Sequence, residues 1–385
     1  DPNYALFKVI PKPPRQGLKK PLAAHKKQIS WVVASVAIIS ICVYLYMYLP
    51  SVNPSTYFLF LRSKALSRRG NNQEVISLLS RITRKDPMFV PAYTLLADTY
   101  QRMGDRESAL KNLFDYALYS EKRHDLKNLA SAYIGIGWFY HLEGEYQKAL
   151  DFYNKAIDLS RQNNDKLNEA VALRKLAVWH TDKQDYALAL ELLTKSSEIN
   201  RDRQRSFEHR YNLACDYFDI GLVLSNKNDF TTAKEFYNKS RLIFEKLKLK
   251  NELSDYYFNL GEICLFEKEY RKALDFYLAG LKIDQTQGNL TNLASDYNML
   301  GELYQEMDNL AQAEACFNRA LSVAKEIKRL PEAADAYYNL GLLYKKKGRK
   351  NMAREHLRYA QEIYHSTDIS VYEEIKKELL SLDGN

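Results

Sequence analysis

Apolar positions along this chain recur every three or four residues, as the buried side of an α-helix requires. Residues 130–165 show the pattern clearly. They predict a first helix over about Asn128–Leu142, a turn at Gly144 and a second helix over about Gln147–Gln162. The apolar and small residues fall on one face of each helix: Tyr133, Ile136, Gly137 and Tyr140, then Ala149, Tyr153 and Ala156. This stretch therefore predicts an antiparallel helical hairpin.

The hairpin pattern repeats with a period of 40 residues. Three columns of equivalent residues keep this step: Gly221, Gly261, Gly301 and Gly341; Ala233, Ala273, Ala313 and Ala353; Tyr217, Tyr257, Tyr297 and Tyr337. A fixed period of this size is the signature of stacked supersecondary units, each of which buries its apolar faces only against its neighbours. The pattern therefore predicts a solenoid rather than a globular enzyme.

The repeats resemble the tetratricopeptide repeat (TPR) family. The family's order of aromatic, Leu-Gly, Tyr, Ala, aromatic and Ala is met by Tyr297, Leu300, Gly301, Tyr304, Ala313, Phe317 and Ala320. The resemblance implies an all-α, right-handed TPR α-solenoid of about seven to eight helical hairpins over residues 56–368, closed by a capping helix within 369–385. The 40-residue step is similar to that of kinesin light chain and of bacterial Rap-type arrays, which implies a groove that binds peptides or helices.

A membrane anchor is predicted ahead of the repeats. Ile29–Leu49 is an uncharged, mostly apolar run whose 21 residues would form a helix about 31 Å long, enough to cross a bilayer core. A cleaved signal peptide fits less well, because no small-x-small cleavage site follows the run. Residues 50–55 form a linker. Residues 1–28 hold seven Lys/Arg and one acid, which favours a cytoplasmic amino terminus and an array across the membrane.

The charge outside residues 1–28 argues against nucleic acid as a partner. The net charge of the whole chain is +8, and the basic, Pro-containing segment 1–28 supplies +6 of it. The repeats are therefore nearly neutral and lack the basic surface that nucleic-acid binding needs. We expect protein partners, and contact with the lipid bilayer through residues 29–49.

No catalytic or cofactor-binding motif is present in the sequence. It contains no Gly-rich phosphate loop, no H-E-x-x-H and no G-x-S-x-G. The four cysteines form no C-x-x-C pair. We therefore expect a non-enzymatic protein without a metal or other cofactor, and no small-molecule substrate.

The resemblance to TPR proteins places a binding surface on the first helix of each hairpin, which lines the concave side. The residues expected there are Trp138, Arg174, Lys175, Phe218, Asn259, Glu262, Asn298, Glu302, Tyr338 and Asn339. Asn259 and Asn339 directly precede Leu-Gly, where the resemblance implies an amide that grips a ligand backbone. The alternative is that Asn is simply a common residue in that column. The lysine and asparagine pattern of chaperone-tail receptors is missing.

One step in the array is 44 residues instead of 40. The extra length falls near residues 200–211 and carries four arginines: Arg201, Arg203, Arg205 and Arg210. They are a candidate basic contact with a partner, or else a solvated helix end.

These observations favour a membrane-anchored TPR scaffold that assembles or stabilises a larger machine of a bacterial envelope. It would be single-pass in the inner membrane with a periplasmic array. One alternative is a membrane-tethered regulatory receptor with cytosolic repeats that bind a peptide or signalling protein. Another is that catalysis resides on an upstream domain.

Overall fold

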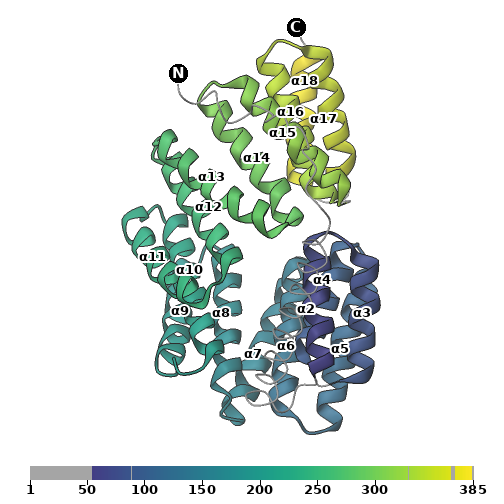
Figure 1. Cartoon of the computed structure of the whole chain (residues 1–385), viewed down its shortest axis with the longest axis vertical. Helices are drawn as coiled ribbons and strands as arrows, with labels where there is room; N and C mark the ends of the chain where they lie inside the picture. Colours follow the sequence, from purple (N-terminus) through teal and green to yellow (C-terminus); the bar gives the residue numbers. More distant parts are fainter. Residues whose placement is uncertain (1–53, 88, 328, 366–368, 384–385) are drawn as a thin grey trace, which may run out of the picture. The chain divides into compact units, whose positions relative to one another are not determined.

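The computed structural model describes residues 54–87, 89–327, 329–365 and 369–383. The chain divides into two compact units, residues 1–58 and 59–385. Within the described residues all regular structure is helical. The seventeen helices, labelled as in Figure 1, are α2 Pro54–Arg68, α3 Asn72–Lys85, α4 Val90–Arg102, α5 Arg106–Lys122, α6 Leu126–Leu142, α7 Tyr146–Gln162, α8 Lys166–Asp182, α9 Tyr186–Arg201, α10 Phe207–Asn226, α11 Phe230–Leu247, α12 Lys250–Phe266, α13 Tyr270–Gln287, α14 Leu290–Glu306, α15 Leu310–Glu326, α16 Leu330–Lys346, α17 Lys350–Tyr364 and α18 Ile369–Asp383.

Among the described residues, contacts pair successive helices as seven hairpins, from α4–α5 to α16–α17, and α18 follows the last one. Ahead of them, an ion pair between Arg62 and Glu74 joins α2 to α3. Short polar turns define where several of the helices start. The side chain of Asp125, for example, accepts a hydrogen bond of 3.0 Å from the backbone N–H of Asn128 at the start of α6. Asp at this position satisfies one of the amides that the first helical turn leaves unpaired. The predicted hairpin at residues 130–165 is confirmed, with bounds within two residues of those expected.

The small-residue column lets the two helices of each hairpin approach closely. A Cβ atom added to Gly261 would lie 2.3 Å from the Tyr277 ring, and one added to Gly301 would lie 2.4 Å from the Phe317 ring. Both rings are fully buried. The glycine therefore makes room for an aromatic ring of the second helix.

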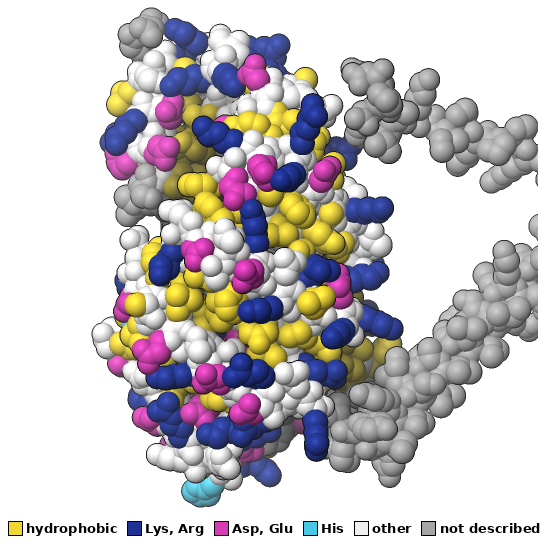
Figure 2. Space-filling view, turned by 90° about the vertical axis from the view of Figure 1, so that its left-hand side faces the viewer, with side chains coloured by type: hydrophobic (Ala, Val, Ile, Leu, Met, Phe, Trp, Pro, Cys, Tyr) yellow, Lys and Arg dark blue, Asp and Glu magenta, His cyan; other side chains and the backbone are white. Residues whose placement is uncertain are grey.

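The core of the array consists of two clusters that meet at α12. One cluster runs from Tyr93 to Ile263 and the other from Phe258 to Leu382. Apolar side chains also reach the surface. Figure 2 shows a band of hydrophobic side chains down the middle of one face, with Lys and Arg side chains beside it.

The irregular step lengthens one helix. The chain leaves α9 at Arg201, turns, and starts α10 at Phe207; α10 has 20 residues, whereas the first helices on either side of it have 17. At the other end of the array, α18 buries Ile375 completely against the last hairpin, as expected of a capping helix.

The predicted anchor, Ile29–Leu49, lies outside the described residues, as do the basic segment 1–28 and most of the linker. Among the helices that the structure describes, none combines the length and the apolar character needed to cross a bilayer.

Candidate functional site

The first helices of most neighbouring hairpins are in contact, in two runs, from α4 to α12 and from α14 to α16. Contacts join α4 to α6, α6 to α8, α8 to α10, α10 to α12 and α14 to α16. The second helices make no comparable contacts with one another within the described residues. The array is therefore narrower on the side of the first helices, which we call the first-helix face.

Aromatic and basic side chains gather on the amino-terminal half of this face. The ammonium group of Lys175 lies 3.4 Å from the centre of the Trp138 ring. Arg174 contacts Asp219 on the next first helix at 3.4 Å. Burial, together with the charge of Arg174, lowers the pKa of Lys175 to about 7. Because Arg174 is paired and Lys175 is only partly charged near pH 7, this half offers a partner mainly the aromatic surface of Trp138.

Arg174 also reaches a buried carboxyl group at the irregular step. Asp216 is fully buried and accepts hydrogen bonds from Ser196 at 2.8 Å and from Asn200 at 2.7 Å. Burial raises the pKa of Asp216 to about 7, although the charge of Arg174, 3.8 Å away, acts in the opposite direction. The network joins α8, α9 and α10, so its primary role is to fix the longer repeat in place.

The carboxy-terminal half of the first-helix face is acidic. Four exposed carboxylates follow one another on α12, α14 and α16; we call Asp255, Glu262, Glu302 and Asp335 the acidic row. The surrounding helices displace part of the water from this row, and its members repel one another. Both effects raise the pKa of Glu262, where the neighbouring charge is Glu302. Loss of water, followed by the charges of Asp284 and Glu252, raises the pKa of Asp255 to about 7.

A buried pair of carboxyl groups lies behind the acidic row. Asp284 is fully buried and accepts hydrogen bonds from Asn289 at 2.9 Å and from Ser254. Asp296 is 4% exposed, and burial, then the charges of Asp284 and Asp255, raise its pKa to about 9. Asp296 therefore holds its proton at neutral pH.

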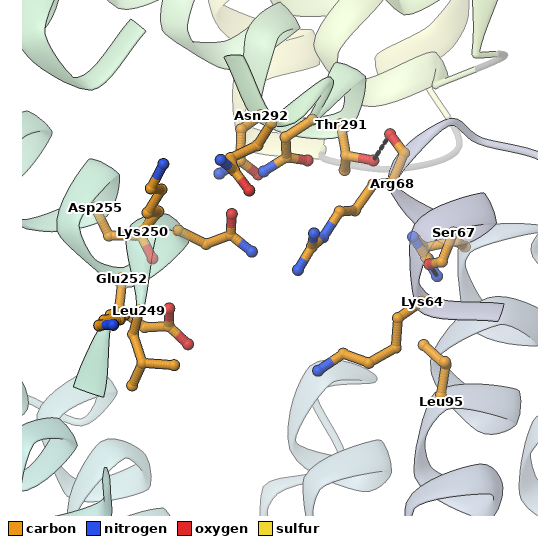
Figure 3. Close-up of a pocket in the computed structure, with 15 residues that line it drawn as sticks. Lys64, Ser67, Arg68, Leu95, Leu249, Lys250, Glu252, Asp255, Thr291 and Asn292 are labelled. Atoms are coloured by element: carbon orange, nitrogen blue, oxygen red, sulfur yellow. Dashed lines mark hydrogen bonds between the residues drawn. The ribbon is translucent and has the colours of Figure 1, made fainter. Parts of the chain in front are cut away.

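A polar cavity of about 650 Å³ adjoins the acidic row (Figure 3). Lys64 and Arg68 of α2 point into it from one side, opposite Glu252 and Asp255 of α12. The hydroxyl of Thr291, at the start of α14, donates to the backbone carbonyl of Arg68 at 3.5 Å. Residues more than 200 positions apart thus line one cavity, with Lys64 and Arg68 on one wall and Lys250 beside the two carboxylates on the other.

The predicted site residues fall into two groups. Trp138, Arg174 and Lys175 lie together, as do Glu262, Glu302 and Asn339, whose amide donates to Glu302 at 2.9 Å. The remaining four predicted residues are engaged with the fold itself, in the contacts that follow.

Phe218 packs on the buried ring of Tyr237, with 5.2 Å between ring centroids. Tyr338 donates to Glu374 of the capping helix at 2.7 Å. Asn259 accepts from Tyr237 and donates to a backbone carbonyl. Asn298 is buried. A partner would therefore meet Asn259 only by exchanging these internal bonds, and the roles expected for the two asparagines stay predictions.

The predicted basic contact at the irregular step is partly at the surface. Arg201, Arg203 and Arg205 are exposed, at the end of α9 and in the turn after it. Arg210, on α10, is half-buried, and its Nε has no hydrogen-bond partner within the described part of the chain. Three arginines are thus exposed to solvent, although Arg203 also donates to the backbone carbonyl of Ile199 at 3.3 Å.

One group of side chains has the composition of a metal site. Among the described residues, potential ligand atoms of Cys264, Glu267 and Glu269 lie within 4.8 Å of one another. Both carboxylates already have lysine partners, Lys234 at 2.6 Å and Lys272 at 2.8 Å. These ion pairs account for the cluster.

Two sequence models described as tetratricopeptide repeat match the chain, one at residues 123–202 and 292–366, the other at 90–113, 217–240 and 254–287. Together they cover more than half of the 385 residues. The chain is a tetratricopeptide-repeat protein.

The curated relatives of this TPR protein are distant. It is 22% identical over 243 residues to response regulator aspartate phosphatase I of Bacillus subtilis (strain 168), covering 62% of this chain and 56% of the relative. It is 20% identical over 236 residues to the protein kinesin light chain-related 2 of Arabidopsis thaliana, covering 60% and 36%. The TPR chain thus spans about a third to just over half of the length of these relatives.

Solved structures show the same fold. A chain of the APC/C hetero-tetramer Cut9–Hcn1 matches with a TM-score of 0.56 and 17% identity, over 86% of this chain and 58% of its own. The Rap conjugation gene regulator of plasmid pLS20, solved with the Phr* peptide, matches with a TM-score of 0.53 and 14% identity, over 73% and 76%. At these identities the likeness extends to the fold alone.

Proposed function

We propose that this TPR protein is a non-enzymatic scaffold that holds a segment of a partner protein on its first-helix face. The observation that carries the proposal is the first-helix face itself, because it gathers charged and aromatic side chains that the core does not need. Exposed carboxylates and a half-buried Trp138 with Lys175 lie beside a polar cavity. Solenoids bind partners on extended surfaces of this kind.

The proposal includes a membrane tether at Ile29–Leu49. The length and apolar character of this run support it, and the basic residues before it favour repeats on the far side of the membrane. In that orientation the protein would serve a multi-protein complex of a bacterial envelope, in secretion, motility or envelope assembly.

A site-specific photo-crosslinker tests the binding face in cells. Placed at Trp138 or Leu222 on the first helices, it should trap a partner; at the exposed Glu235 or Asp275 on the second helices, it should not. Equal trapping at both sets would overturn the first-helix face as the binding surface. Replacing Asn259 and Asn339 by Ala should weaken partner capture without unfolding the array.

A second candidate is a regulatory receptor with cytosolic repeats. It is favoured by the likeness to the Rap regulator solved with its Phr* peptide, since a shared fold can present a similar peptide-binding surface. A topology reporter fused after Asn385 separates the two candidates. A periplasmic signal supports the envelope scaffold, and a cytosolic signal supports the receptor.

A further inference from the structure

The acidic row carries charge that the protein itself does not neutralise. Asp255 and Glu262 have no cation within ion-pair distance among the described residues, Glu302 has only the amide of Asn339, and Asp335 has only a hydrogen bond from the Tyr364 hydroxyl. Some surface carboxylates on neighbouring helices are paired, as Glu378 is with Lys345 at 2.6 Å, whereas others, such as Glu235 and Asp275, are single exposed groups on the second helices. Like charges on neighbouring helices repel and cost stability. A cationic group of a partner would therefore bind to the row without displacing an internal cation.

The row is also reachable. All four of its carboxylate side chains are exposed, and the polar cavity opens beside Asp255. A ligand can approach them without moving the helices.

A buried amide on the same helix lacks a partner. Asn298 is 4% exposed, and its amide donates to the backbone carbonyl of Glu332 at 3.3 Å, but its Oδ1 has no hydrogen-bond partner in the described part of the chain. Asn298 lies one helical turn before Glu302 on α14, so both side chains project from the same side of the helix. A buried acceptor without a donor is costly, and a backbone N–H of a bound segment would satisfy it.

The repeat sets the spacing of the carboxylates. Glu262 and Glu302 are 40 residues apart and therefore equivalent in adjacent hairpins, and Asp255 and Asp335 are equivalent two hairpins apart. Packed helices lie about 8–10 Å apart, and α14 and α16, which carry Glu302 and Asp335, are in contact. An extended chain advances about 3.3 Å per residue, so a basic residue at about every third position would meet successive carboxylates.

We propose that the acidic row binds an extended segment of a partner protein that carries Lys or Arg at about every third residue. This inference rests on the proposed function and specifies the chemistry of the partner. Charge complementarity is the reason for the choice, since the row repels nucleic acid and anionic lipid. The chain's own basic segment 1–28 could compete for the same row, and the test distinguishes that occupant.

The test measures binding of two labelled probe peptides to the purified full-length chain by fluorescence anisotropy. One probe is five repeats of Lys-Ala-Ser, and the other replaces every Lys by Glu. We expect the Lys probe to bind, with an affinity that falls as salt rises. The Glu262→Gln/Glu302→Gln variant should weaken it about fivefold to thirtyfold, as loss of two partly exposed charge contacts does. The control variant Glu235→Gln/Asp275→Asn, on the second helices, should bind like the wild type.

Three results would overturn the inference: equal binding by the row variant and the control variant, preference for the Glu probe, or tighter probe binding after deletion of residues 1–28, which would make that segment the occupant. Unchanged far-UV circular dichroism and melting temperature show that the variants fold. If the crosslinker at Leu222 still traps a partner while the row variant has no effect, the scaffold function is supported and the proposed basic partner segment is refuted. If the crosslinker traps no partner, the proposed scaffold function is refuted.

Discussion

The close approach of α12 and α13 at Gly261 gives the sharpest test of how the repeats pack. In the hairpins where this column holds glycine, the facing residue is mostly aromatic, as with Gly261 and Tyr277. In the hairpin where it holds Ala177, the facing residue is the smaller Leu193, fully buried. The summed volume of the two side chains is therefore similar in the Gly261–Tyr277 and Ala177–Leu193 pairs, and Gly261→Ala increases it.

We expect Gly261→Ala to destabilise the array by about 1–2 kcal/mol. A Cβ atom 2.3 Å from the Tyr277 ring forces a shift of two helices or of a ring that is 1% exposed, and overpacking of this kind costs about 1–3 kcal/mol. The better helix propensity of Ala offsets up to about 1 kcal/mol of that cost. Tyr277→Leu alone should cost about 1–3 kcal/mol through the cavity that it leaves.

The double variant Gly261→Ala/Tyr277→Leu recreates the pairing of Ala177 with Leu193. It should be more stable than the sum of the single changes implies, with a coupling of about 1–2 kcal/mol. Urea unfolding followed by circular dichroism gives the three free-energy changes, and hydrogen exchange in α12 and α13 localises them, since an array need not unfold as one unit. Gly135→Ala is the control, because its Cβ would meet only the end of Leu113, at 3.1 Å. If Gly261→Ala stabilises the protein as much as the control does, the close approach does not limit packing.

Three further expectations concern charge and the capping helix. Asp296 keeps its proton up to about pH 9 in the fold but only to about pH 4 when unfolded, so the folded state binds more protons between these values and stability falls as pH rises. Asp296→Asn should reduce that fall in melting temperature; an unchanged slope between pH 5 and 8 would contradict it. Binding of the Lys probe should be lost as pH falls through the raised pKa values of the acidic row, near 7 for Asp255; binding that persists at pH 5 would argue against these carboxylates as the contacts. Ile375→Asp should detach α18 at a cost of about 2–4 kcal/mol, seen as faster hydrogen exchange in α17; unaltered exchange would show that α18 does not cap the core.

Local chemistry determined the helices. The apolar period of three to four residues and the capping residues act within one or two turns, so the bounds of α6 and α7 could be predicted to within two residues. The columns of equivalent residues also predicted the stacking, because each hairpin must bury the same faces. Glu262 and Glu302 belong to one column, and their proximity follows from the repeat.

The tertiary structure decided which residues from different columns of the repeat lie close together. Asp216 and Asp296 look like ordinary helical acids in sequence, yet packing buries both and raises their pKa values. Asp255 was missed although its column repeats at Asp335, since nothing in the pattern distinguishes an unpaired carboxylate from a paired one.

The sequence by itself thus determined that the chain is an array of helical hairpins, because helix formation and repeat stacking depend on neighbours; the anchor at Ile29–Leu49 stays a prediction. Only the tertiary structure placed Arg68 beside Thr291 around a polar cavity and left the acidic row without internal cations. Contacts between residues more than 200 positions apart depend on the small rotation between each hairpin and the next, added over the whole array. A local sequence pattern does not predict that total rotation.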